Sequence, residues 1–384
     1  MAPVRSRLVF YFPGFDPLDA QAHHARYVRS AAQSGATFGI DYQVGPVEES
    51  PAGSRFDVVA RRGGEATDTR LYVHDHNAII SQLRDLPIWM QIARGYQAFG
   101  AIVAERAAGR YFRHAWRFGL FFIFPYLLIT LGLVLSALIA ALPWLLSLSP
   151  LALVVSVPLA LLLFGKGVLG ISKRFHTLHL FADWRFAVMV GRDEAMARAW
   201  IDEKASQLCL ALDTPSDEVL IVSHSMGASL ALAVVGRILE TRPEAFDGRT
   251  VSFVTLGGAA LQCAFLSSAS RLRHSIGALA HHRHVRWFDI QCLSDPIHPF
   301  ACHTAKLSGY PDAPQPAIIK VKFKHMLSDA RDKKNKLNFL RLHRQYVLGS
   351  DRKCGYDFTL LTAGPLPAAS FAALKSHTPP PPFE

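Results

Sequence analysis

The sequence predicts an α/β protein in which a mostly parallel sheet, flanked by helices, is interrupted by a two-helix transmembrane hairpin. Three observations predict this arrangement. Residues 218–224 form an apolar run rich in β-branched residues, as in a buried strand, and an Ala- and Leu-rich run typical of a helix follows at once. A similar apolar run at 8–12 predicts another buried strand. Residues 118–165 contain no Asp, Glu, Lys or Arg, although one membrane span needs only about 20 residues.

The other elements follow from the same patterns in chain order. Gly35 is expected to end the first helix, and Gly63-Gly64 to join two strands as a hairpin of irregular loop length. The proline-rich tail at 366–384 is expected to be disordered or extended. Strands are predicted at 37–44, 55–62, 69–74, 249–256, 285–292 and 318–323, and helices at 20–33, 77–116 and 193–212.

Composition and charge point to a membrane rather than to nucleic acid. The chain has 384 residues, enough to bury a substantial core. Apolar residues make up 50% of it and the mean hydropathy is +0.18, which is high for a wholly soluble protein. The formal net charge is +11, but no basic run is interleaved with aromatic residues as in nucleic-acid modules. The five scattered cysteines predict neither a disulfide framework nor a zinc site, and they suit a reducing compartment.

Two spans fit the uncharged segment, at about 118–142 and 151–169, with a short turn between Pro143 and Pro150. Positive residues flank the pair on the outside, and the turn carries none. By the positive-inside rule both arms face the cytoplasm, which predicts a bacterial inner-membrane protein with its folded domain on that side. The flanking residues are Arg106, Arg110, Arg113 and Arg117 before the first span, and Lys166, Lys173 and Arg174 after the second.

The junction after residue 224 carries the candidate nucleophile. Ser225 lies in a tight turn between strand and helix, with Ser223 two positions before it and Gly227 two positions after it. This is a variant of the G-x-S-x-G nucleophile elbow, in which the flanking positions must be small so that the serine hydroxyl can point into solvent. Ser223 replaces the usual glycine but is still small.

These residues resemble the α/β-hydrolase superfamily, and within it the serine esterases and lipases. The resemblance covers about the first forty residues and the part from about Phe175 to the end. It implies an α/β-hydrolase-type sheet and an oxyanion loop after the first strand, at Pro13-Gly14. By this resemblance the backbone N–H groups of Phe15 and Met226 are the expected oxyanion-hole donors.

The acidic member of the triad is expected in a loop after a late strand. Asp295, in the sequence Ser-Asp-Pro-Ile after the strand at 285–292, resembles the acid of the superfamily. Asp289 lies within that strand and is the weaker candidate. Asp-Pro is also a common turn sequence, so the assignment depends on its order after Ser225.

Two histidines fit the third position of the triad. His325 follows the last predicted strand directly, whereas His343 follows a highly charged loop at 328–336. His343 is preferred, because His343-x-x-Tyr346 at the start of a final segment resembles several bacterial membrane-associated hydrolases of this superfamily. His325 remains the alternative.

His74-Asp75-His76 contains three residues of types that bind metal ions. Alternate residues of a strand point to opposite faces and no third ligand is evident, so no metal or cofactor is expected.

Four segments result: 1–116 and 171–365 as the two parts of one hydrolase domain, 117–170 as the transmembrane hairpin, and 366–384 as the tail. The order Ser225, Asp295, His343 implies a membrane-anchored serine hydrolase that cleaves an ester-type, hydrophobic or lipid substrate through an acyl-enzyme. Two alternatives stay open: a thioesterase or acyltransferase with the same triad, and a non-catalytic scaffold that keeps the fold.

Overall fold

The computed structural model describes residues 3–335, 338–381 and 383. Within them nine strands form one mixed sheet, in the order β2-β4-β5-β1-β6-β7-β8-β9, with β3 paired to β4. From β5 to β9 neighbouring strands run parallel, and β2, β3 and β4 are antiparallel. The strands are β1 Ser6–Phe12, β2 Asp41–Val44, β3 Glu48–Ser50, β4 Gly53–Arg62, β5 Glu65–Val73, β6 Glu218–His224, β7 Val251–Leu256, β8 Val285–Cys292 and β9 Ala317–Val321.

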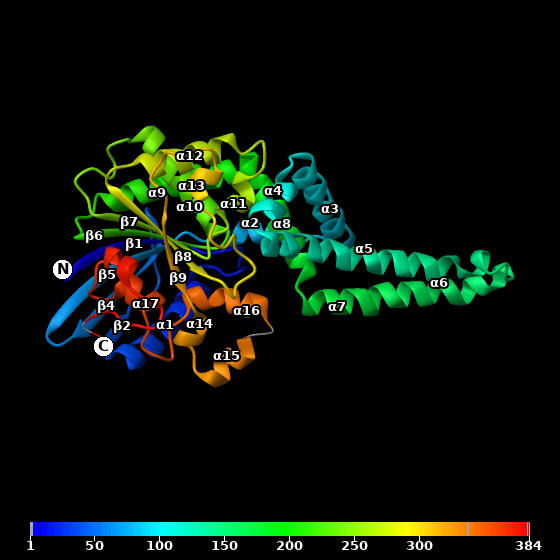
Figure 1. The fold of residues 1–384 in the computed structure, drawn as a ribbon, viewed down its shortest axis with the longest axis horizontal. Coiled ribbons are helices and arrows are strands. Elements are labelled where there is room, and N and C mark those ends of the chain that lie inside the picture. Colours follow the sequence, from blue (N-terminus) through cyan, green and yellow to red (C-terminus); the bar gives the residue numbers. More distant parts are fainter. Residues whose placement is uncertain (1–2, 336–337, 382, 384) are drawn as a thin grey trace.

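Helices cover both faces of the sheet, so the α/β prediction is confirmed at this level (Figure 1). Consecutive residues of β1 serve opposite faces: Leu8, Phe10 and Phe12 belong to one apolar cluster, Val9 and Tyr11 to the other. Helices on one face contribute buried residues to the first cluster: α8 Thr177–Gly191, α9 Ala195–Leu212, α10 Gly227–Thr241, α11 Ala260–Ala264 and α12 Ser270–His281. Helices on the other face contribute to the second cluster: α1 Ala20–Phe38, η3 Arg344–Val347, α17 Phe358–Ala363 and η4 Ala368–Ala373.

Several short helices connect these layers. The predicted helix at 77–116 is three helices, because Pro87 starts a new one and Arg106 takes a left-handed conformation with φ 61°. The connecting helices are α2 Asn77–Arg84, α3 Ile88–Ala104, α4 Ala107–His114, α13 Thr304–Leu307, α14 Phe323–Met326, α15 Asp329–Asn335 and α16 Phe339–His343. α15 occupies most of the predicted charged loop, whose residue 336 lies outside the described part.

Two predicted turns differ from the structure. Helix α1 continues through Gly35 to Phe38, and Gly39, with φ 68°, ends it in the left-handed conformation that favours glycine. The predicted strand at 37–44 therefore starts only at Asp41. Gly63 and Gly64, with φ 57° and 85°, form a tight two-residue hairpin turn rather than a loop of irregular length.

The uncharged segment forms two antiparallel helices that run side by side away from the sheet (Figure 1). The first is α5 Trp116–Leu145, and the second, Pro150–Arg174, comprises η1 Pro150–Ala152, α6 Leu153–Leu162, η2 Leu163–Val168 and α7 Leu169–Arg174. Both are long and apolar enough to span a membrane. Only 28% and 17% of their most apolar windows are buried, so they are not core helices of a soluble domain.

The tail is packed on the domain. Residues 368–373 form η4, where Ala368 and Phe371 are buried, and Phe383 is buried against Arg62 and Phe38. The prediction of a disordered or extended tail is wrong for this part; residues 382 and 384 lie outside the described residues.

Candidate active site

Ser225 lies at the carboxyl end of β6, in a left-handed backbone conformation with φ 54°. A non-glycine residue adopts this conformation only where its surroundings impose it. Here the Ser225 N–H donates to the carbonyl of Leu256 on β7 at 3.1 Å, and its carbonyl accepts from the N–H groups of Ala228 and Ala259 at 3.1 and 2.9 Å. These bonds hold the half-buried serine side chain at the sheet edge.

The turn touches the end of β1, which explains its small residues. A Cβ on Gly227 would lie 2.2 Å from the carbonyl oxygen of Phe12, and a Cβ on Gly14 would lie 3.0 Å from the Cβ of Ser225. Only glycine allows this approach of two backbones. Ser223, the departure from the usual motif, is buried in β6, where its hydroxyl donates to the carbonyl of Val254 at 3.4 Å.

Asp295 and His343 are brought together. Both are buried, and His343 Nδ1 lies 2.7 Å from Asp295 Oδ2. Because a carboxylate can only accept, Nδ1 carries a proton, so in the tautomer that this bond favours Nε2 is the acceptor. Nε2 is buried and has no hydrogen-bond partner among the described residues. Ser225 and His343 line the same pocket.

Asp295 also holds a second histidine. His298 Nδ1 lies 3.0 Å from the same Oδ2, and the N–H of Ile297 donates to Oδ1 at 3.0 Å. Burial by itself raises the pKa of Asp295, but the neighbouring His343 and His298 outweigh it and hold that pKa below its usual value. The carboxyl group is therefore ionised at neutral pH.

Two further residues position His343, and neither was predicted for this role. The buried ring of His224 lies 4.6 Å from that of His343, and its Nε2 donates to the His343 carbonyl at 3.1 Å. Burial lowers the pKa of His224 well below its usual value, so the ring is neutral. The Tyr346 hydroxyl accepts from the N–H of Cys292 at 2.8 Å, which ties the segment after His343 to the end of β8. The His-x-x-Tyr spacing was the only sequence feature that pointed to Tyr346.

The two alternative residues lie in other surroundings. Asp289 accepts hydrogen bonds from Thr255 Oγ1 at 2.7 Å and from Gln291 Nε2 at 2.8 Å. His325 is partly exposed, and its Nδ1 lies 3.2 Å from the hydroxyl of Ser376. Neither hydrogen-bonds to Asp295 or His343 among the described residues.

The two expected oxyanion donors flank Ser225. Phe15 follows Gly14 in the loop that touches the serine, and Met226 is the next residue in the chain. Neither backbone N–H donates to another group in the described part of the chain. The Phe15 ring is fixed between Phe186 and His179, with centroids 5.4 and 5.1 Å away.

A pocket of about 50 Å³ lies over Ser225. One part of its wall is apolar and includes Phe121 of α5, the first apolar helix. Another part carries charged and polar groups that the sequence analysis did not single out, Asp16, His179, Asp183 and Arg344. Arg344 forms an ion pair with Asp16 at 3.3 Å, and Arg26 forms another with the same carboxylate at 2.5 Å.

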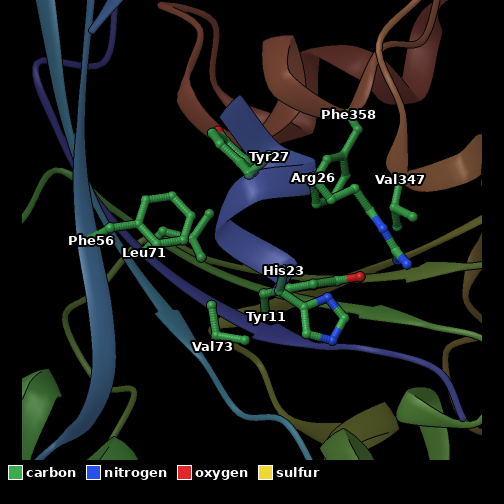
Figure 2. A pocket seen from close by; sticks show the side chains of 9 residues that line it. All are labelled: Tyr11, His23, Arg26, Tyr27, Phe56, Leu71, Val73, Val347 and Phe358. Carbon is green, nitrogen blue, oxygen red and sulfur yellow. The ribbon is translucent and has the colours of Figure 1, made fainter. Parts of the chain in front are cut away.

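Figure 2 shows a separate pocket on the α1 side of the sheet, where the side chains of Tyr11, His23 and Arg26 meet. Its volume is about 10 Å³, at the lower limit for a single water molecule, so it is a packing defect rather than a substrate site. Arg26, which lines this pocket, pairs with Asp16, which lines the separate pocket over Ser225.

The histidines of the rejected metal motif are buried separately. His74 stacks on Phe10 and His76 on Phe186, with centroids 5.9 and 5.1 Å apart. Burial lowers the pKa of each to about 3, so both are neutral. The described residues contain no group of three or more His, Cys, Asp or Glu side chains that could hold a metal ion. No protein-family model, curated protein or solved structure matches this chain.

Proposed function

We propose that this chain is a membrane-anchored serine hydrolase that cleaves an ester-type substrate through an acyl-enzyme on Ser225. One observation carries the proposal: the unpartnered Nε2 of His343, oriented by Asp295, shares a pocket with a serine held in a left-handed turn. This is the arrangement of nucleophile, base and orienting acid that serine hydrolases use. The nucleophile strand, turn and helix, in a mostly parallel sheet, support an α/β-hydrolase-type fold.

In the proposed reaction, His343 Nε2 takes the proton of the Ser225 hydroxyl as its oxygen attacks the ester carbonyl. The N–H groups of Phe15 and Met226 stabilise the oxyanion. His343 then returns the proton to the leaving alcohol, and a water molecule, activated by the same histidine, releases the acyl group. Asp295 keeps His343 in the required tautomer throughout. The reaction needs no metal or cofactor.

A hydrophobic or lipid ester is the proposed substrate class. Phe121 lines the Ser225 pocket and belongs to α5, the apolar helix proposed as the first span. An acyl chain could therefore pass from the bilayer to the serine along α5 without crossing water. The basic residues outside the hairpin and the uncharged turn support a cytoplasmic location for the domain, as at a bacterial inner membrane.

Labelling of isolated membranes with a fluorophosphonate probe tests this function. Wild-type protein should be labelled, and Ser225→Ala and His343→Ala should abolish labelling, because the probe reacts only with an activated serine. His325→Ala is the matched control and should label like wild type, since His325 pairs with Ser376 instead.

Labelling that survives Ser225→Ala would place the nucleophile elsewhere. Loss of labelling in His325→Ala but not in His343→Ala would reverse the assignment of the base. An unlabelled but folded wild-type protein would favour the non-catalytic scaffold.

A further inference from the structure

Asp183 lies in the wall of the Ser225 pocket but outside the proposed triad. It comes from α8 and is only 8% exposed. Gln262 Nε2 donates to its Oδ2 at 3.0 Å. Gln262 belongs to α11, which follows the Gly257-Gly258 turn after β7, and its carbonyl accepts from the Tyr111 hydroxyl at 2.6 Å. Gln262 therefore binds one oxygen of Asp183, and Tyr111 of α4 in turn holds Gln262 in place.

Within the described part of the chain, no cation compensates this carboxyl group. The titratable groups that face it are Tyr111 of α4, Tyr126 of α5 and Cys263 of α11, none of which can be cationic, and burial raises the pKa of Tyr111 and of Cys263. His179, one turn earlier on α8, is also neutral, because burial lowers its pKa to about 4. Burial raises the pKa of Asp183 to about 7, against a smaller opposing effect of the Gln262 hydrogen bond.

Burying a carboxyl group without a cationic partner lowers the stability of the fold, and packing alone does not require an acidic residue at this position. Asparagine would keep the bond to Gln262 through its side-chain oxygen. An unpaired acid in a substrate pocket is a candidate for ligand recognition when the catalytic machinery leaves it unused.

Resting on the proposed hydrolase function, we propose that Asp183 is a specificity-determining residue that donates a hydrogen bond from its protonated carboxyl group to a hydroxyl oxygen of the substrate. The preferred substrate is then an uncharged ester with a hydroxyl group near the scissile carbonyl, as in a monoacylglycerol. A phosphate at that position would meet a like charge whenever Asp183 ionised.

Two esters of the same acyl chain test this role: a monoacylglycerol, which has free hydroxyl groups, and a p-nitrophenyl ester, which has none. We expect Asp183→Leu in the full chain in detergent to lower kcat/KM about tenfold for the monoacylglycerol, the effect of one hydrogen bond. For the p-nitrophenyl ester the change should stay within about twofold, because that ester makes no such bond.

The pH dependence separates recognition from packing. In the wild type, the ratio of kcat/KM for the monoacylglycerol to that for the p-nitrophenyl ester should change as pH rises through about 7, because ionisation converts Asp183 from a donor to the substrate hydroxyl into an acceptor from it. The ratio cancels the titration of the shared base. In Asp183→Asn it should not change with pH, because an amide does not ionise in this range.

Equal losses on both esters, or a ratio that still changes with pH through about 7 in Asp183→Asn, would overturn the role of Asp183. Fluorophosphonate labelling of the same preparations keeps that failure distinct from failure of the hydrolase proposal. If the variants are labelled while the ester ratios contradict expectation, only the specificity role falls. If the wild type is not labelled, both proposals fall.

Discussion

At the scale of single residues, one carboxylate oxygen of Asp295 binds two histidine rings. His343 and His298 approach Oδ2 at 2.7 and 3.0 Å. Because the pKa of Asp295 is held below its usual value, this group stabilises the fold at every pH above the unfolded pKa of about 4. That contribution is lost only as pH falls through the lower, folded-state value.

Asp295→Asn should slow fluorophosphonate labelling of Ser225 by about 10⁴, because the amide favours the wrong tautomer of His343. Asp289→Asn is the matched control, because Asp289 is also a buried acid but lies within β8. Its carboxylate accepts hydrogen bonds from Thr255 and Gln291. This variant should label within a few-fold of wild type. The measurement is the labelling rate at neutral pH, and equal rates for the two variants would refute the role of Asp295.

The sequence was informative about these residues to different degrees. Ser225 and Gly227 could be predicted because the turn imposes local steric limits on neighbouring positions. Asp295 and His343 depended on their order along the chain. His224 and Asp183 could not be found, because their roles come from contacts with segments distant in sequence, α16 and α11, which no local pattern encodes.

At the scale of elements, the contact between β1 and the turn before α10 joins the proposed oxyanion loop to the nucleophile. Gly227 has carbonyl oxygens of Phe12 and Pro13 at 2.2 and 2.3 Å from the position of a Cβ. Any side chain there must push the two elements apart.

Gly227→Ala should therefore abolish labelling. It should also lower the free energy of unfolding of the purified protein by at least about 1–3 kcal/mol, which is measured as a lower thermal midpoint. Gly109→Ala on α4 is the control, because nothing lies within 4 Å of its Cβ position. It should leave labelling unchanged and stabilise the helix by up to about 1 kcal/mol. Normal labelling in Gly227→Ala would mean that the contact is not required.

The C-terminal segment is fastened to β1 by a buried ion pair. Arg7 Nε lies 2.7 Å from Glu218 Oε2, and the other guanidinium nitrogens donate to the carbonyls of Gly364 and Leu366. Glu218 Oε1 in turn accepts from the N–H of Ala368. The proline-rich sequence of the tail predicts a disordered or extended segment, because the partners that hold it lie more than a hundred residues away in the chain.

Arg7→Ala should lower the free energy of unfolding by about 3–5 kcal/mol, because Glu218 is left buried and unpaired. Arg5→Ala, at an exposed position two residues earlier, should change it by no more than about 0.5 kcal/mol. Thermal unfolding in detergent measures both, and limited proteolysis should release the C-terminal segment first in Arg7→Ala. Equal midpoints for the two variants would contradict this role of the ion pair.

At the scale of the whole molecule, one sheet is assembled from both sides of the apolar hairpin. β1 lies between β5, which precedes the hairpin, and β6, which follows it, and is parallel to both. A continuous sheet needs both arms on one side of a membrane, which only an even number of spans allows. The two helices satisfy that requirement.

The proposed topology predicts that the turn of the hairpin is accessible from outside the cell. In a Cys209→Ser background, whose four other cysteines are buried, Ser149→Cys should react with a membrane-impermeant maleimide in intact cells. Glu244→Cys, at an exposed position of the domain, should react only after lysis. The reverse pattern would invert the orientation, and reaction of both in intact cells would exclude a cytoplasmic domain.

Much of this architecture could be predicted from sequence, because parallel strands and membrane spans are marked by their own apolar runs. The hairpin was predicted within a few residues at its start, since charge ends abruptly at Arg117, and at its turn, since Pro143 and Pro150 bracket it. The division of 77–116 into three helices was missed, because one apolar stripe continues across both breaks, the first at Pro87 and the second at the left-handed Arg106.

Because β1 pairs with strands from both sides of the hairpin, its two edges are paired at different times during synthesis. The ribosome delivers β1, β4 and β5 first, then the hairpin, and only afterwards β6. In the proposed topology, the central strand therefore waits with one hydrogen-bonding edge open while the hairpin enters the bilayer. Slow insertion would prolong that exposure, so the biogenesis of this protein is coupled to the pace of membrane insertion and not only to the stability of the finished sheet.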